Sequence, residues 1–352
     1  MLEKREHGRD EPIIDPDLPI VDAHIHLFDR PPLRYLFDDY LADATAGHRI
    51  VASVYVETQA FVRRDGPEVL RPLGEVEFAN GVAAMAASGA YGPCRVAAGI
   101  VGHADLRLGA AVGALLDRCL AVAPDRYRGV RQITLDHPSD APYRYMSVRP
   151  PRDVLDHPRF REGFAEIGRR GLTFDAAIFH NQLGDLAALA DAFPDTVIVL
   201  NHLGYAMALG EDAAGRRAVF AAWRDGLRAI ARRANVICKV GGLGMVPWGF
   251  GLDQRREPVG YRELADTWRP YVEEAIAAFG VERCMMQSNY PPDARTAGYV
   301  PLWNALKHLT AGCSAGEKAA LFHGTATRIY RLALPADARS AAAATMARSP
   351  SS

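Results

Sequence analysis

The chain has 352 residues, of which 49% are hydrophobic and 24% are charged, and its formal net charge is −1. This composition is typical of a water-soluble globular protein, and the near-zero charge excludes a general attraction to nucleic acid or to a membrane surface. The five cysteines are far apart and form no C-x-x-C pair, which argues against a disulfide framework. The amino terminus has no apolar stretch of the kind a secretory signal needs. We therefore expect a cytoplasmic protein that acts on a small molecule, with a homo-oligomer left open.

Short β-branched segments alternate with longer segments rich in Ala, Leu and Arg along most of the chain. Because the short segments are continuously apolar, as strands covered on both faces are, they predict a parallel sheet. Eight strand-then-helix units fit a (β/α)8 TIM barrel, an α/β fold, whereas the alternative of an open doubly wound sheet would call for a glycine-rich phosphate loop that the sequence lacks. The predicted strands are 20–27, 50–57, 95–102, 127–134, 172–179, 196–201, 235–240 and 283–287, and the predicted helices include 76–88, 108–121, 182–192, 213–233 and 261–279.

Two longer segments interrupt this alternation. Residues 136–159 contain five prolines, and residues 241–260 are rich in glycine, so they predict loop insertions after the fourth and seventh strands. In a barrel both would lie over the catalytic face, with solvated surface loops as the alternative. We expect one barrel domain over residues 17–334, a disordered or loosely packed amino-terminal arm over 1–16, and a flexible tail over 335–352.

The first predicted strand ends in two histidines. His24 and His26 are separated by one residue, and side chains at positions i and i+2 of a strand lie on the same face. Neutral imidazole is the commonest metal ligand and also donates a hydrogen bond to a developing oxyanion. The pair therefore predicts a catalytic centre at the carboxyl end of this strand, against the alternative of two unrelated histidines.

Polar or titratable side chains also end the other predicted strands. The carboxyl ends of barrel strands meet at one face, where barrel enzymes place their chemistry, so these side chains predict a shared site. One polar residue at a strand end could arise by chance, but a series over eight consecutive strands is harder to explain in that way. The series includes His24 and His26, then Glu57, His103, Arg131, His180, His202, Lys239 and Asn289, with Asp293 four residues further on.

Four motifs in this series carry a resemblance to a known family. They are His24-x-His26, Gly129-Val130-Arg131, Asn201-His202-Leu203-Gly204 and Ser288-Asn289-Tyr290-Pro291. In this order the motifs resemble the amidohydrolase-related (amidohydrolase 2) TIM-barrel hydrolases, and within them the branch that includes the pyrone-dicarboxylate and sugar lactonases. The resemblance runs from about Ile20 to Tyr330 and implies a barrel that carries out hydrolysis.

The resemblance also implies roles for particular residues. His24, His26 and His202 would line the bottom of the active site, and position 289 would be the place where such enzymes usually have a catalytic aspartate. The residue here is Asn289, which cannot act as a general base and binds a divalent metal less well than a carboxylate does. Asp293 is near enough in sequence to supply the missing carboxylate by folding back.

Two mechanisms are consistent with these residues. In the first, His24, His26 and His202 hold one zinc-like divalent ion, which lowers the pKa of a bound water. In the second, no metal binds, the imidazoles stabilise the oxyanion directly, and a carboxylate activates water. The lactonase branch includes members that work without a metal, and the resemblance therefore favours the metal-free mechanism by a small margin.

Further strand-end residues are expected to bind the substrate. Arg131 can hold a substrate carboxylate through two parallel hydrogen bonds, with a surface salt bridge as the alternative. Glu57 can act as an acid or base or can orient one of the histidines, and Lys239 is expected beside an anion or at the surface. Tyr290 and Trp248 can form an apolar wall for a ring-shaped substrate, with core packing as the alternative. The predicted substrate-binding set is Arg131, His180, Asn289, Tyr290, Glu57 and Lys239.

The sequence thus predicts hydrolysis of a lactone or related cyclic ester of a small carboxylated metabolite. Asp293 or a metal held by the histidines would activate the water, the three imidazoles would stabilise the oxyanion, and Arg131 would hold the acid group. The first alternative is a metal-dependent, non-oxidative decarboxylation of an aromatic or enoic acid. The second alternative, motivated by Asn289, is a barrel that binds a ligand without catalysis.

Overall fold

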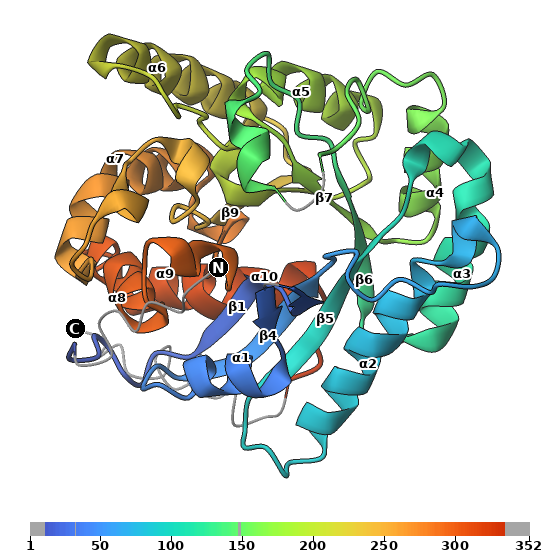
Figure 1. The fold of residues 1–352 in the computed structure, drawn as a ribbon, viewed down its shortest axis with the longest axis horizontal. Helices are drawn as coiled ribbons and strands as arrows, with labels where there is room; N and C mark the ends of the chain where they lie inside the picture. The colour runs from blue at the N-terminus through green and yellow to red at the C-terminus, as the bar shows by residue number, and fades with distance from the viewer. Residues whose placement is uncertain (1–10, 32, 147–148, 335–352) are drawn as a thin grey trace, which may run out of the picture.

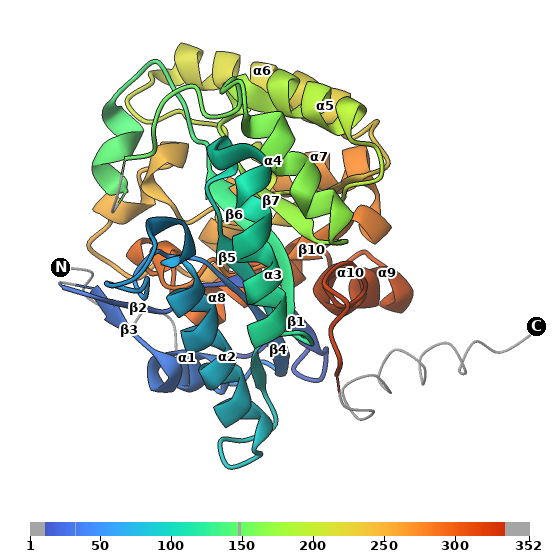
Figure 2. The ribbon, with the colours of Figure 1, turned by 90° about the vertical axis from the view of Figure 1, so that its right-hand side faces the viewer.

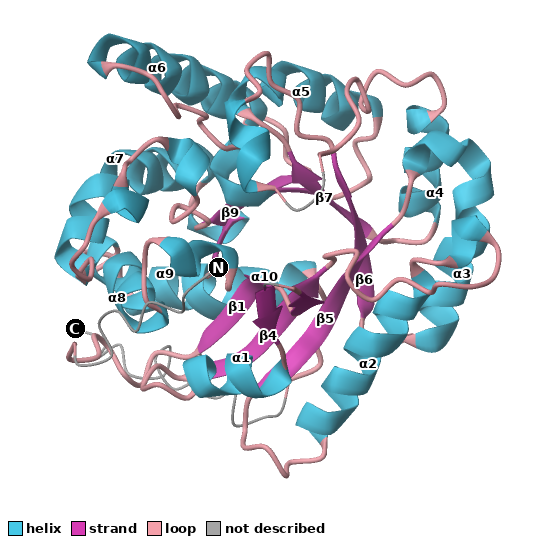
Figure 3. Ribbon diagram, viewed as in Figure 1, coloured by secondary structure: helices cyan, strands magenta, loops and turns pink. Residues whose placement is uncertain are grey.

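Eight parallel strands form a barrel in a computed structural model that describes residues 11–31, 33–146 and 149–334. The strands are hydrogen bonded in the order β1-β4-β5-β6-β7-β8-β9-β10, and helices surround them (Figures 1 and 3). The chain therefore has the (β/α)8 fold that the alternating apolar segments predict. The barrel strands are β1 (Ile20–Ile25), β4 (Ile50–Val56), β5 (Arg95–His103), β6 (Tyr127–Ile133), β7 (Thr173–Ala177), β8 (Ile198–Leu200), β9 (Val236–Val240) and β10 (Cys284–Met286).

The barrel closes where the first strand meets the segment that follows the last one. Ile25 and Tyr290 form a parallel bridge, and the amide of His26 donates to the carbonyl of Tyr290 at 2.8 Å. The amide of Asn289 donates in turn to the carbonyl of His24 at 3.0 Å. These backbone bonds hold the His-x-His strand beside the Asn289 segment, although the two are more than 260 residues apart in sequence.

Ten helices lie in the part of the chain that the structure describes, most of them on the outside of the barrel. Figure 2 shows α2, α3 and α4 on the outside of the barrel, where α2 packs on β5 and α4 packs on β7. They are α1 (Phe37–Ala44), α2 (Leu73–Ala87), α3 (Gly113–Val122), α4 (Phe160–Arg169), α5 (Leu183–Ala192), α6 (Ala213–Ile230), α7 (Tyr261–Phe279), α8 (Tyr299–Leu309), α9 (Ala315–Ala319) and α10 (Thr325–Ile329).

Several observed strands are shorter than the sequence suggests. β7 ends at Ala177 and β8 at Leu200, before the predicted ends at 179 and 201, and His180 and His202 lie in the turns that follow, beyond the strands as predicted. Helix α7 has the predicted bounds, and the remaining predicted helices differ at their ends. A two-stranded antiparallel hairpin, β2 (Phe28–Arg30) with β3 (Leu33–Tyr35), is absent from the predicted elements. Such short elements carry too little periodicity to be recognised.

The inside of the barrel is apolar and tightly filled. Side chains from β1, β4, β5, β8, β9 and β10 form one buried cluster, against which Tyr330, Leu332 and Leu334 pack. Gly99 permits this approach, because a Cβ at that position would lie only 2.9 Å from Leu332 Cδ2. The chain after α10 is therefore part of the barrel core, and the cavity of the site must lie elsewhere along the barrel axis.

The described part of the expected amino-terminal arm contacts helices α7 and α8. The amide of Ile14 donates to Asn304 at 2.9 Å, Lys307 donates to the carbonyls of Ile14 and Asp15, and the amide of Tyr261 donates to Glu11. Residues 1–10 and the expected tail over 335–352 lie outside the described residues. Within the described ranges, no helix combines the length and the apolar composition that crossing a bilayer requires.

Candidate active site

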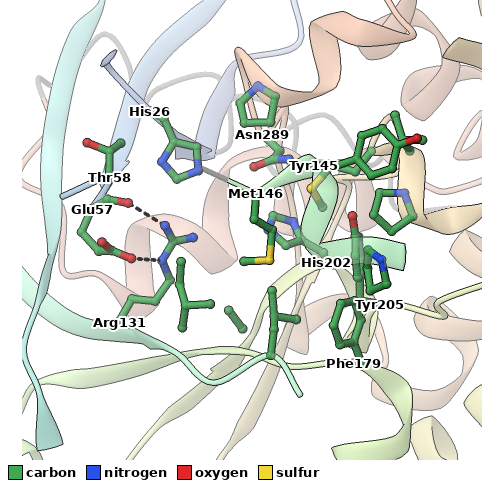
Figure 4. A pocket seen from close by; sticks show the side chains of 18 of the residues that line it. His26, Glu57, Thr58, Arg131, Tyr145, Met146, Phe179, His202, Tyr205 and Asn289 are labelled. Carbon is green, nitrogen blue, oxygen red and sulfur yellow. Dashed lines mark hydrogen bonds and ion pairs between the residues drawn. The ribbon is translucent and has the colours of Figure 1, made fainter. Parts of the chain in front are cut away.

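A cavity of about 200 Å3 opens where the barrel strands end (Figure 4). Two long connections supply much of its wall, the one between β6 and α4 and the one between β9 and α7. Glu57 and Arg131 lie on one side of the cavity and Phe179 and Tyr205 on the other. Its polar lining is His26, Glu57, Thr58, Gln59, Arg131, His202, Asn289, Arg30 and Arg295, and its apolar lining includes Ile133, Leu135, Met146, Tyr145, Met245 and Val246.

The three histidines converge at the base of this cavity. His24 Nε2 lies 3.1 Å from His26 Nε2, and the ring centroids of His24 and His202 are 4.7 Å apart. His202 reaches this place because residues 202–205 all have positive φ values after β8 ends. Gly242 leaves room for its ring, since a Cβ at that position would lie 2.2 Å from His202 Nδ1. The structure thus brings together three imidazoles from distant parts of the sequence.

All three imidazoles are held in the neutral form. Burial lowers the pKa of His24, His26 and His202 well below the usual value, and the nearby positive charges of Arg131 and Lys239 lower the pKa of each further. A neutral imidazole can donate a hydrogen bond from one nitrogen and accept one at the other. These residues are therefore suited to hydrogen bonding with a reacting carbonyl, and not to supplying positive charge.

Glu57 and Arg131 form a buried ion pair at the cavity wall. Arg131 Nε donates to Glu57 Oε1 at 2.7 Å, and its Nη2 donates to the backbone carbonyl of Glu57. The second carboxylate oxygen, Glu57 Oε2, is buried without a hydrogen-bond partner. Among the described residues that line the cavity, Glu57 is the only one with a carboxylate. An unpartnered oxygen at this place is available to a substrate or to a water.

Asp293 lies behind the cavity wall, on the far side of Asn289. Asn289 Nδ2 donates to Asp293 Oδ1 at 2.7 Å, and the amide of Gly244 donates to Asp293 Oδ2 at 2.8 Å. Burial raises the pKa of Asp293 to about 7, and these two hydrogen bonds oppose the shift only in part. Asn289 therefore lines the cavity with its side chain fixed by Asp293, while both Asp293 oxygens are already engaged.

Lys239 is fully buried below His24 and does not line the cavity. Its Nζ donates to Asp175 Oδ2 at 2.7 Å and lies 3.3 Å from His24 Nδ1. The Asp175 carboxylate also accepts from Tyr330 Oη at 2.9 Å and from Asn201 Nδ2 at 3.0 Å. The anion beside Lys239 is thus Asp175 and not Glu57.

The structure places two further members of the predicted substrate-binding set outside the cavity lining. His180 packs near His137, with ring centroids 6.2 Å apart, and the amide of Met207 donates to its Nδ1 at 3.3 Å. Burial lowers the pKa of His180 to about 4. Tyr290 is buried and donates to the carbonyl of Ala297 at 2.7 Å, and Trp248 is buried with its Nε1 donating to the carbonyl of Gly242. Both aromatic residues occupy packing positions.

Glu75 supports the site from behind, and the sequence pattern does not reveal it. From the first turn of α2 it accepts hydrogen bonds from the amide of Thr58 at 2.8 Å, the hydroxyl of Thr58 at 2.6 Å, the amide of Gln59 at 3.2 Å and the hydroxyl of Tyr55 at 2.9 Å. It therefore fixes the turn after β4 that carries Glu57. Acidic residues are common in the first turn of any helix, so its sequence position gives no signal. Asp175 could have been noticed, as a charged residue within an apolar strand.

The amidohydrolase family model matches residues 21–332, and the chain therefore belongs to the amidohydrolase family. It is a hydrolase, as its family and the hydrolase names of its relatives indicate. This agrees with the resemblance that the four sequence motifs carry.

One relative is the protein y4mH of Sinorhizobium fredii, which is 34% identical over 90% of this chain and 99% of that protein. Another is the L-fucono-1,5-lactonase of Burkholderia multivorans, which is 29% identical over 91% of this chain and 98% of that protein. An amidohydrolase from Burkholderia multivorans has a similar fold. Its structure with bound HEPES has a TM-score of 0.67, and its structure with bound zinc has a TM-score of 0.63, each at 24% identity over 89% of this chain and 99% of that one.

The Burkholderia multivorans structure contains zinc, but the side chains of the present chain do not fit a divalent metal in their observed arrangement. His24 Nδ1 faces Lys239 Nζ, and His24 Nε2 lies 3.3 Å from Arg131 Nη1, so both ring nitrogens face cationic groups. Over residues 11–31, 33–146 and 149–334, no three His, Cys, Asp or Glu side chains form a group that could hold an ion.

Proposed function

We propose that this hydrolase opens a lactone or related cyclic ester of a small carboxylated metabolite, by a mechanism that uses no metal. The observation that carries the proposal is the unpartnered Oε2 of Glu57 in a cavity that also contains the buried donors Arg131 and His202. Water attack on an ester carbonyl requires an acceptor for the proton of water and donors for the oxyanion that forms. Both kinds of group are present.

In the proposed reaction, Glu57 Oε2 accepts a proton from water as the water oxygen bonds to the carbonyl carbon. The negative charge that develops on the carbonyl oxygen is stabilised by Arg131 Nη1 and by His202 Nε2–H. The proton of His202 is on Nε2 because Gln287 Nε2 donates to its Nδ1 at 2.6 Å. The carbon–oxygen bond of the ring then breaks, and protonated Glu57 returns the proton to the departing alkoxide. The product is an open-chain hydroxy acid.

This proposal assigns water activation to Glu57 in place of Asp293. Both Asp293 oxygens accept hydrogen bonds from protein groups, and its side chain is absent from the cavity lining. Its proposed role is to fix the orientation of Asn289, whose amide faces the cavity. His24 is likewise proposed to act through His26, which lies between it and the substrate space.

The cavity also suggests where the carboxylate and the apolar part of the substrate bind. Arg131 is neutralised by Glu57, so a substrate carboxylate would gain less from it than from an unpaired cation. Arg295 lines the same cavity with its guanidinium 5.8 Å from the centre of the Tyr145 ring. We therefore assign the acid group of the substrate to Arg295. Apolar side chains of the same cavity, which include Ile133, Met146 and Phe179, fit an apolar part of the molecule.

The experiment is a panel of five- and six-membered lactones, each with and without a carboxylate, assayed by proton release in buffer containing a chelator. The expected result is hydrolysis of at least one carboxylated lactone, a loss of about 100-fold in turnover in His202→Ala, and unchanged turnover in the control His137→Ala, which is outside the cavity. Arg295→Gln should raise KM for the carboxylated lactone and leave KM for the lactone without the carboxylate unchanged. Failure of every lactone to react would refute the proposal.

The same panel distinguishes the two alternatives. Aromatic and enoic acids are included, and carbon dioxide release that depends on added Mn2+ or Zn2+ would establish decarboxylation. Ligand binding without turnover of any compound would establish a barrel that has lost its catalytic function, the alternative that Asn289 motivates.

A further inference from the structure

A continuous row of hydrogen bonds runs from Asp175 through Lys239 to the His-x-His pair. Lys239 Nζ lies 2.7 Å from Asp175 Oδ2 and 3.3 Å from His24 Nδ1. His24 Nε2 lies 3.1 Å from His26 Nε2, and His26 Nδ1 lies 2.8 Å from the carbonyl oxygen of Val56. The side chains in this row are buried, so water cannot supply alternative partners easily.

The two ends of the row determine where its protons are. The carbonyl oxygen of Val56 can only accept, so the proton of neutral His26 must be on Nδ1, and its Nε2 must be a lone pair. The 3.1 Å contact then requires a proton on His24 Nε2, which leaves a lone pair on His24 Nδ1. The ammonium group of Lys239 can only donate, and it donates to that lone pair.

The opposite arrangement satisfies fewer contacts. A proton on His24 Nδ1 would point at the Lys239 ammonium group, and two lone pairs would face each other between His24 and His26. Its one gain would be a hydrogen bond from Arg131 Nη1 to His24 Nε2, at 3.3 Å. An unsatisfied buried polar group costs about 1–3 kcal/mol, so the arrangement fixed by Lys239 is the favoured one.

We propose that Lys239 is a positioning residue that holds His24 as its Nε2–H tautomer and His26 as its Nδ1–H tautomer, and thereby keeps divalent metal out of the site. Binding of one ion by both Nε2 atoms requires a lone pair on each of them, at roughly 2.0–2.1 Å from the metal. In the row, the lone pair of His26 Nε2 is occupied by the His24 proton, and His24 Nε2 has none. If the His24 proton moved from Nε2 to Nδ1, it would point at the ammonium group of Lys239.

This inference extends the metal-free part of the proposed function, and neither of its tests requires turnover, so it can fail while the proposed function stands. The first test uses the wild-type protein and long-range 1H–15N correlation of its histidine side chains, which separates Nδ1–H from Nε2–H tautomers. His24 and His26 signals are assigned from His24→Gln and His26→Gln. His48 is an internal reference, because its Nδ1 lies 3.0 Å from Lys307 Nζ and its Nε2 lies 3.2 Å from the carbonyl of Val300.

The expected spectrum shows Nε2–H for His24, Nδ1–H for His26 and Nε2–H for His48. A spectrum with Nδ1–H for His24 or Nε2–H for His26 would overturn the proposal. This measurement tests the tautomers of both residues even if the variants below do not fold.

The second test measures Zn2+ binding by calorimetric titration. Lys239→Met alone would leave the Asp175 carboxylate buried without its charge partner, which is strongly destabilising, so the variant is the double substitution Lys239→Met with Asp175→Asn. Its Zn2+ affinity should exceed that of the wild type by about 100-fold. Adding His24→Ala to the double variant should abolish the gain.

Lys307→Met is the matched control, because it also removes a buried lysine that contacts a histidine, but at a place remote from the cavity. It should leave Zn2+ affinity at the wild-type value. An equal affinity in the wild type and the double variant, or a gain that persists without His24, would overturn the proposal.

Discussion

Glu57, after β4, and Asp293, after β10, are both fully buried carboxyl groups near the same cavity, but their surroundings differ. Glu57 uses one oxygen to pair with Arg131 and has no partner for Oε2. Asp293 uses both oxygens, for Asn289 and for the amide of Gly244. A buried carboxyl group is available for proton transfer only when one of its oxygens remains free beside the substrate, and the hydrogen-bond partners decide this.

The largest effect is expected for Glu57→Gln. The amide retains the shape of the side chain but cannot accept a proton from water, and loss of a general base typically costs about 100-fold to 10,000-fold. Turnover of the best lactone in the panel should fall within this range. The melting temperature should also fall, because Arg131 loses its buried charge partner, so circular dichroism at the assay temperature checks that the variant is folded. Near-normal turnover in Glu57→Gln would show that water is activated by another group.

Arg131→Lys should have the second-largest effect. Lysine keeps the positive charge but cannot donate from Nε to Glu57 Oε1 and from Nη2 to the Glu57 carbonyl at the same time. Turnover should fall about 10-fold to 100-fold, as expected for loss of one donor to the oxyanion together with misplacement of Glu57. If kcat is unchanged and only KM rises, Arg131 binds the substrate without stabilising the oxyanion.

Asp293→Asn completes the comparison and should lower turnover by less than about 10-fold, because the variant loses no group in direct contact with the substrate. Steady-state kinetics on the same lactone as used for Glu57→Gln provides the measurement. A loss as large as that of Glu57→Gln would mean that Asp293 reaches the reacting water, and would reverse the roles assigned to the two carboxyl groups.

The smallest effect concerns stability. The pKa of Asp293 is raised to about 7 by burial, so its contribution to the free energy of unfolding is fully present below the unfolded value of 3.8 and is lost as the pH rises through 7. The melting temperature of the wild type relative to Asp293→Asn should therefore fall by about 3 °C between pH 5 and pH 8. Thermal unfolding of both proteins in a series of buffers measures the difference.

Asp117→Asn is a control for which the pH dependence of the melting-temperature difference should have the opposite sign. The hydrogen bond from Arg170 lowers the pKa of Asp117, so its stabilising contribution is lost as the pH falls and not as it rises. A melting-temperature difference for Asp293→Asn that does not depend on pH would show that Asp293 has an ordinary pKa in the folded protein.

The sequence by itself determined the barrel and the meeting of the histidines. Continuously apolar segments alternating with helical ones specify parallel strands with helices outside, and the two-residue period of a strand directs His24 and His26 to one side. Because parallel strands end at one face, Glu57, Arg131 and His202 are also expected there. These properties follow from local periodicity and from the connection rules of the fold.

Only the tertiary structure decided which of these side chains are already paired within the protein and which can interact with a substrate. Arg131 and Glu57 are 74 residues apart, and Lys239 and Asp175 are 64 residues apart, so their pairing depends on strand register and side-chain direction. The same is true of Asp293, whose closeness to Asn289 in sequence gave no indication that the amide of Gly244 binds its second oxygen. A hydrogen bond is short and directional, and its partners are therefore fixed only when distant strands are in place.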